Sequence, residues 1–254
     1  MSVQEAGVVF IVPGELDFKY LTRNLLSPSD SFVRGNKRYL SWKETMLPAR
    51  DVADNPLDRN LPVVYAAPVQ FELKGYKGSL HTWNDFGKWI ATLNEGLDEL
   101  DSASVRKARM LVENCTSRDD SIRVLYEYLQ QHTHYFYTGY GIGGTRPIPA
   151  TEVATYGYGD CKALSIYMKA LLKAVGIESW YTLVESGPGE SIETDFPGSQ
   201  FDHVILCVPG SDTVWLECTN PSLPYGFPGS FTCDRDVLAI TPDGGKILHT
   251  PVYG

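Results

Sequence analysis

The sequence of 254 residues lacks the features that mark membrane and nucleic-acid-binding proteins. It contains no apolar run of the roughly 20 residues that a membrane-spanning helix needs. Its 22 basic and 31 acidic side chains give a formal net charge of −9, and no basic face is apparent. A protein that binds the phosphate backbone of a nucleic acid would need such a basic face. We therefore expect no transmembrane segment and no nucleic-acid partner.

A signal peptide is not recognisable either, because no charged segment leads into a long apolar one. The nearest candidate is the apolar run at residues 7–12, which is short and ends at Pro13-Gly14. We expect the chain to be cytoplasmic, or to be a mature or trimmed piece of an exported protein.

Cysteine is sparse and follows no recognisable framework. The five cysteines, at positions 115, 161, 207, 218 and 233, predict no disulfide scaffold and include no Cys-x-x-Cys pair. His132 and His134 could chelate zinc from one strand face, but no third ligand is evident. The Gly-rich segment 139–144 lacks the Lys-Ser/Thr of a phosphate-binding loop and is interpreted as a wall of a cleft. We expect no metal and no cofactor.

The most informative feature present is Cys161, at the start of a predicted amphipathic helix. Gly157 and Gly159 allow a tight turn before it, and Gly176 would end the helix with a left-handed cap. Apolar residues recur between them at helical spacing: Leu164, Met168, Leu171, Leu172 and Val175. A thiol at a helix N-terminus lies near unpaired N–H groups, which favour the nucleophilic thiolate. The alternative is a small, buried, apolar cysteine.

Two predicted strands downstream supply a base and an acid. Residues 201–208 carry His203 near their start, residues 213–219 carry Glu217, and the turn at 209–212 predicts a hairpin between them. Adjacent antiparallel strands would place the two side chains together as a cross-strand pair. Alone, each is an ordinary strand residue. Together with Cys161 they match the three groups of covalent catalysis: Cys161 as the nucleophile, His203 as the base and Glu217 as the acid that orients the base.

These motifs resemble a known family. Residues 81–225 are similar to the transglutaminase-like, papain-related superfamily of cysteine enzymes, in the segments 158–162, 171–177, 202–204 and 215–219. The resemblance implies that Cys161, His203 and Glu217 are catalytic. It also implies a bacterial protein of the periplasm or cell envelope, in which a β-rich domain precedes the catalytic core.

The sequence departs from the family pattern at three positions. Glu217 stands where the superfamily usually has Asp, and Ala163 stands where the closest subfamily has Asp. Arg146 follows the Gly-rich segment in which that subfamily tends to have Gln. Arg146 is therefore an oxyanion candidate, with main-chain N–H groups as the alternative. Asp160 and Tyr158 are further candidates for the cleft.

The predicted fold is α+β, with helices packed on an antiparallel sheet in a transglutaminase-like core at residues 81–254. Helices are expected over residues 86–100, after a start at 82–85 that resembles a capping box, and over residues 105–112 and 119–129. Residues 1–80 predict a partial β-rich segment that supplies no catalytic residue, with strands at 39–42, 63–65 and 70–73 and loops at 48–51 and 54–56. The acidic loop at 187–199 is interpreted as a flap over the cleft.

Three functions remain open from the sequence. The first is a cysteine peptidase or amidase that forms an acyl-enzyme with a peptide or protein substrate. The second is a transglutaminase, in which a lysine amine instead of water releases the same acyl group. The third is a non-catalytic binding or scaffold module of the same fold.

Overall fold

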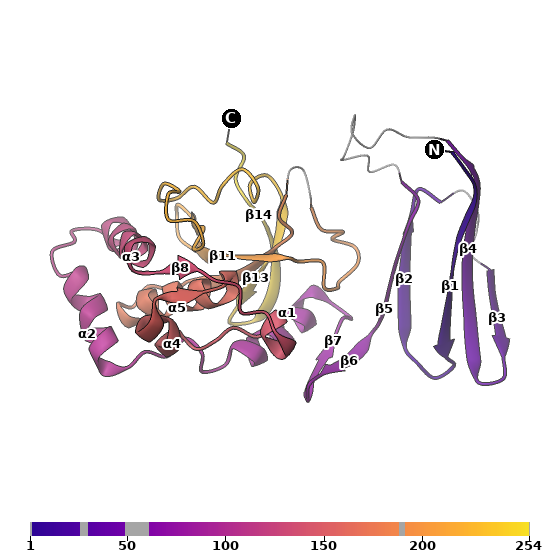
Figure 1. The fold of residues 1–254 in the computed structure, drawn as a ribbon, viewed down its shortest axis with the longest axis horizontal. Coiled ribbons are helices and arrows are strands. Elements are labelled where there is room, and N and C mark those ends of the chain that lie inside the picture. The colour runs from indigo at the N-terminus through magenta and orange to yellow at the C-terminus, as the bar shows by residue number, and fades with distance from the viewer. Residues whose placement is uncertain (1, 26–29, 49–60, 188–190, 254) are drawn as a thin grey trace. The chain divides into compact units, whose positions relative to one another are not determined.

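The computed structural model describes residues 2–25, 30–48, 61–187 and 191–253, and Figure 1 shows their helices and strands. The chain separates into two compact units, residues 1–71 and 72–254. The predicted boundary after residue 80 falls inside the second unit. Trp89 explains the difference, because its Nε1 donates to the carbonyl of Tyr76 at 3.2 Å and so joins the segment before residue 80 to the first helix. The assignment of functions to the two parts stays a prediction.

The first unit consists of antiparallel strands. They are β1 (Val3–Pro13), β2 (Phe18–Arg23), β3 (Asp30–Arg34), β4 (Lys37–Leu47) and β5 (Val63–Pro68). They form one sheet of order β1-β4-β3 and a separate pair β2-β5. Trp42 is its buried centre, with the rings of Tyr20 and Phe10 at 5.0 and 5.8 Å. The predicted strands at 39–42 and 63–65 are confirmed, whereas the loop at 54–56 and residues 49–51 lie outside the described residues.

Five α-helices are described in the second unit. They are α1 (Trp83–Asn94), α2 (Ser102–Leu111), α3 (Arg118–His132), α4 (Ala150–Tyr156) and α5 (Cys161–Ala174). The predicted first helix, 86–100, was too long. Gly96, with a φ of 73°, turns the chain just after α1, and Asp101 already caps α2. The sequence analysis missed α4, a helix of only two turns between Pro149 and the left-handed cap Gly157.

A five-stranded antiparallel sheet forms the other layer of this unit. Its strands are β10 (Trp180–Val184), β11 (His203–Val208), β12 (Val214–Leu216), β13 (Asp236–Thr241) and β14 (Gly244–His249), in the order β12-β11-β10-β13-β14. Two pairs of strands are separate from this sheet: β6 (Gln70–Leu73), whose residues fall on both sides of the unit boundary, with β7 (Tyr76–Ser79), and β8 (His134–Tyr135) with β9 (Tyr158–Gly159). The predicted α+β class is confirmed.

Helix α5 is the centre of the core. It contacts α2, α3 and α4 as well as β10 and β11, and Figure 1 shows it among these elements. Its fully buried side chains are Leu164, Ile166, Met168, Leu171 and Leu172. Burying each such side chain contributes about 1.5–3 kcal/mol. The helix ends as predicted, because Gly176 has a φ of 77° and its N–H donates to the carbonyl of Lys173.

Gly87 offers a test of the packing of α1 on β14. A Cβ at Gly87 would lie 2.1 Å from the main-chain nitrogen of Gly245. Gly→Ala in a helix interior ordinarily stabilises by about 0.5–1 kcal/mol, but here the overlap should reverse the sign. We expect Gly87→Ala to lower the free energy of unfolding by about 1–3 kcal/mol in urea denaturation. Lys88→Ala, on the exposed side of the same helix, is the control and should change it by under about 0.5 kcal/mol.

Candidate active site

Cys161 is the first residue of α5, and Asp160 forms the turn before it. The Cys161 residue is 8% exposed. Asp160 is the N-cap, and its Oδ1 accepts a hydrogen bond from the N–H of Ala163 at 3.1 Å. Its Oδ2 accepts from Lys162 Nζ at 2.6 Å and from Thr138 Oγ1 at 3.0 Å. Asp160 is fully buried, and these three hydrogen bonds fix the backbone of the turn that precedes the thiol.

The turn before the thiol also depends on a small residue at position 159. A Cβ on Gly159 would lie 2.7 Å from the Cβ of Ala163. Ala163, which departs from the family pattern, is fully buried and fills this space. The departure at Ala163 is thus accommodated by local packing around the start of α5.

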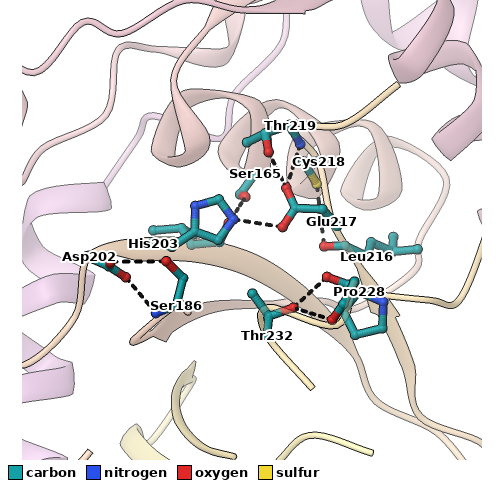
Figure 2. A network of polar contacts seen from close by, with 12 residues as sticks. Ser165, Ser186, Asp202, His203, Leu216, Glu217, Cys218, Thr219, Pro228 and Thr232 are labelled. Carbon is teal, nitrogen blue, oxygen red and sulfur yellow. Dashed lines mark hydrogen bonds and ion pairs between the residues drawn. The ribbon is translucent and has the colours of Figure 1, made fainter. Parts of the chain in front are cut away.

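His203 and Glu217 are joined by a hydrogen bond of 2.7 Å between Nε2 of the imidazole and Oε2 of the carboxylate. Figure 2 shows the two side chains pointing toward each other from the start of β11 and the segment after β12. They are not opposite each other in the ladder, as the sequence analysis expected. The last described pair of the ladder is Leu206 with Leu216, so the contact is a diagonal one made beyond the end of β12.

Glu217 is fully buried, and both its carboxylate and its main-chain carbonyl accept hydrogen bonds. Its Oε1 accepts hydrogen bonds from the N–H of Thr219 at 2.8 Å and from Thr219 Oγ1 at 2.5 Å. Its main-chain carbonyl accepts from the phenol of the buried Tyr126 at 2.8 Å. Thr219 therefore aims Oε2 at His203. The sequence analysis quoted Thr219 within a motif but gave it no role, although a hydroxyl two residues after an acid is a recognisable local signal.

The electrostatics of the imidazole are set by its two neighbours. Burial of His203 disfavours the charged ring, but hydrogen bonds to Cys161 and Glu217 and their negative charge outweigh it and raise the pKa of His203 to about 10. Because Nε2 bonds Glu217, Nδ1 is the ring nitrogen left for Cys161. The structure thus brings Cys161, His203 and Glu217 together in that order. The ring of Phe231 covers the imidazole, with centroids 5.6 Å apart.

The other candidates lie around this centre in different ways. Tyr158, in β9, packs its ring against Phe136 at 5.6 Å and Tyr156 at 6.1 Å. Arg146 donates from Nε to the carbonyl of Leu93 near the end of α1, at 3.0 Å. No described contact joins Arg146 to the thiol or the imidazole, so its oxyanion role stays a prediction that this geometry does not favour.

Two sequence interpretations around the site need correction. His132 ends α3 whereas His134 begins β8, so the two histidines do not share a strand face. The interpretation of 187–199 as a flap does not fit its described part. Ile192 and Phe196 are buried there, and the carbonyl of Thr194 accepts a hydrogen bond from Trp83 Nε1 at 2.7 Å. The loop is anchored on α1, and residues 188–190 lie outside the described residues.

Among the described residues, no three His, Cys, Asp or Glu side chains are grouped to hold a metal ion. Within the same part of the chain, the helices are all too short or too polar to span a membrane.

The remaining cysteines provide internal controls. Cys207 lies in β11 as predicted, but Cys218 lies two residues beyond the end of β12, where a strand residue was expected. Both are buried and free. Burial raises the pKa of Cys207 to about 12, and burial together with the charge of Glu217 raises that of Cys218. Neither thiol is suited to form a thiolate near neutral pH.

We expect Cys161 to react with iodoacetamide fastest of the five cysteines near pH 7. Its sulfur lies at the start of α5 and is hydrogen-bonded to His203, the base that a nucleophilic thiol requires. Alkylation is followed per site by peptide mass spectrometry, and His203→Ala should slow it about tenfold or more at Cys161 alone. Cys115 is partly exposed and is the reference thiol. Equal rates at positions 115 and 161 would contradict an activated thiol.

The raised pKa of His203 also predicts a pH profile. The imidazolium should persist to about pH 10, so turnover that needs this proton should fall only as the pH rises through that value. Glu217→Gln removes a negative charge that favours the imidazolium, and the alkaline limb should shift to lower pH. Asp202→Asn is the control, because the Asp202 carboxylate bonds Ser186 at 2.7 and 3.0 Å and not the imidazole. An alkaline limb that moves equally in both variants would contradict this assignment.

Comparison with known proteins finds a solved structure of the same fold. The structure is similar to a crystal structure named "putative protease" from Parabacteroides distasonis ATCC 8503, with a TM-score of 0.68 and 17% identity. The alignment covers 99% of this chain and 46% of that one, so this chain spans less than half of that protein's length. A "putative cysteine protease" from Cytophaga hutchinsonii aligns over 86% of this chain and 74% of its own, with 11% identity and a TM-score of 0.37, which is too low to carry an argument. No family model and no curated protein matches the sequence. At this identity the first similarity establishes a shared fold, one also found in a protein named as a protease.

Proposed function

We propose that this chain is a cysteine peptidase or amidase of the transglutaminase-like superfamily. The observation that carries the proposal is the bond of 2.7 Å between His203 Nε2 and Glu217 Oε2. It leaves Nδ1 of the same ring for Cys161. A buried acid, an imidazole and a thiol at a helix N-terminus are the three parts that nucleophilic acyl transfer requires.

Acylation begins from the pair of thiolate and imidazolium. The sulfur of Cys161 attacks the carbonyl carbon of an amide, and the electron pair of the C=O bond moves to the oxygen. The N–H of Cys161, which makes no described hydrogen bond within the helix, is available to stabilise that oxyanion. His203 then donates its proton to the amine, the C–N bond breaks, and a thioester remains on Cys161.

Deacylation uses the same groups in reverse. Neutral His203 takes a proton from water as the water oxygen attacks the thioester, and the C–S bond breaks to give a carboxylic acid and regenerate the ion pair. Glu217 holds the ring in one orientation and stabilises its charge. Thr219 holds Glu217, and Asp160 holds the turn at Cys161. All these residues belong to residues 81–254, and we propose that the segment 1–80 supplies no catalytic group.

Water is favoured over a lysine amine as the acyl acceptor. His203 begins β11 and its side chain is 13% exposed, so part of the ring is accessible to solvent. No feature of the sequence marks a dedicated path for an amine. A transglutaminase remains the second candidate function, because the acyl-enzyme and its three residues would be the same.

The function is tested by incubating the protein with a peptide library, with and without a primary amine, and identifying products by mass spectrometry. We expect hydrolysed peptides from the natural protein and at least a thousandfold less product from Cys161→Ala, since the nucleophile is lost. Circular dichroism should show that the variant keeps its fold, because alanine is tolerated at a helix start. Cys207→Ala is the matched control and should keep activity if folded.

Two other outcomes would reject the hydrolase. Products dominated by amine-linked peptides would indicate a transglutaminase. A folded protein that forms neither kind of product would favour a non-catalytic binding module.

A further inference from the structure

Three tyrosines just before the catalytic turn expose large aromatic surfaces. Tyr135, Tyr137 and Tyr140 are 49%, 57% and 84% exposed; together they are called the aromatic ledge. Single exposed apolar residues are ordinary, but a contiguous group usually marks an interaction surface. With Phe136, which is 59% exposed, four of the six residues from 135 to 140 are exposed aromatic residues.

The ledge begins beside the thiol. Tyr135 pairs with Gly159 in the parallel ladder of β8 and β9, and Gly159 is two residues before Cys161. The N–H of Phe136 donates to the carbonyl of Gly159 at 2.8 Å. Further along, Thr138 Oγ1 donates to Asp160 Oδ2 at 3.0 Å. Tyr135 in β8 and the segment that follows it to Thr138 therefore lie alongside the turn that carries the nucleophile.

Tyr135 lies near Cys161, and Tyr137 and Tyr140 follow it in the chain. Burial and the charge of Cys161, followed by Asp160 and Tyr137, raise the pKa of Tyr135, which agrees with its place next to both. The rings of Tyr137 and Tyr140 lie 6.3 Å apart. Tyr137 folds back over Gly139, where a Cβ would lie 2.3 Å from its hydroxyl. Gly139 is thus required for this ring position.

The ledge also offers main-chain hydrogen bonds. β8 and β9 form a sheet of two strands. The N–H groups of His134 and Phe136 point to β9, so by the alternation of a strand the N–H and C=O of Tyr135 point to the opposite edge. Among the described residues, none forms a main-chain ladder with that edge. An extended peptide can add to an edge of this kind.

The electrostatic character of the ledge limits its ligand. Residues 133–145 contain no Asp, Glu, Lys or Arg, although the whole chain has a net charge of −9. Asp160, which accepts a hydrogen bond from Thr138 of this segment, is buried and paired with Lys162. A neutral aromatic surface favours uncharged apolar or aromatic side chains, because a charged one would lose hydration without gaining a partner.

We propose that the aromatic ledge is a substrate subsite that binds an extended peptide with an apolar or aromatic side chain next to the scissile bond. This inference rests on the proposed hydrolase and names its substrate class. The outer edge of β8 pairs with the peptide backbone, and the tyrosine rings contact its side chain. Tyr137 and Tyr140 act as specificity-determining residues and take no part in the proton transfers at His203.

The test uses two peptide amides that differ only in the residue on the acyl side of the cleaved bond, Phe in one and Asp in the other. We expect the natural protein to prefer the Phe peptide in kcat/KM. Tyr137→Ala and Tyr140→Ala should each lower that preference about three- to tenfold. Gly139→Ala, which displaces the Tyr137 ring, should do the same without removing any aromatic group. Phe32→Ala in the first unit, 54% exposed, is the control and should leave the preference unchanged.

A binding measurement keeps the two proposals separate. Cys161→Ala should bind the labelled Phe peptide more tightly than the Asp peptide in fluorescence anisotropy, and Tyr137→Ala added to it should remove the difference. Ledge-dependent binding by a protein that hydrolyses nothing would support the subsite and overturn the hydrolase. Hydrolysis whose preference survives all three ledge substitutions would overturn the subsite and keep the hydrolase. Binding of a glycan instead of either peptide would also overturn the subsite.

Discussion

The contact between α5 and β11 is the constraint on which the candidate site depends. Cys161 begins the helix and His203 begins the strand, so the distance between thiol and imidazole is fixed where these two elements meet. Ser165, one turn into α5, donates from Oγ to the carbonyl of Val204 at 3.4 Å and joins them directly. Leu164 and Met168 of α5 and Val204 and Leu206 of β11 are all buried, so this bond lies within an apolar core. Packing of such density leaves little freedom for the two elements to slide.

The buried charges of the site stabilise one another only in a particular protonation state. Glu217 is removed from water, which is costly unless its charge is paired and hydrogen-bonded. Thr219 and protonated His203 meet both conditions. Since the pKa of His203 is raised from 6.5 to about 10, its stabilisation of the fold is complete below about pH 6.5 and is lost as the pH rises through about 10. The arrangement that supports the chemistry is therefore also a pH-dependent part of the stability.

The sequence predicted the parts of this protein that local patterns determine. The sequence predicted α5 from Cys161, Gly176 and the helical spacing of apolar residues between them. The hairpin signal at 209–212 located β11, which begins at His203, and β12, which ends one residue before Glu217. Patterns failed where the outcome depends on neighbours distant in sequence. The first helix ends at Asn94 because Gly96 and the cap of α2 interrupt it, although Leu97 continues the apolar spacing and is buried outside the helix. The diagonal contact of His203 with Glu217 depends on where β12 ends, which no local signal specifies.

Asp160 links the catalytic turn to the proposed subsite. One of its oxygens caps α5 through the N–H of Ala163, while the other accepts from Lys162 and from Thr138, which lies between the ledge residues Tyr137 and Tyr140. A buried ion pair of this kind adds little net stability, because desolvation offsets much of the attraction. Its value here is geometric. A single carboxylate positions both the segment that presents the thiol and the segment that would hold the substrate, so neither can shift without breaking a buried hydrogen bond of the other.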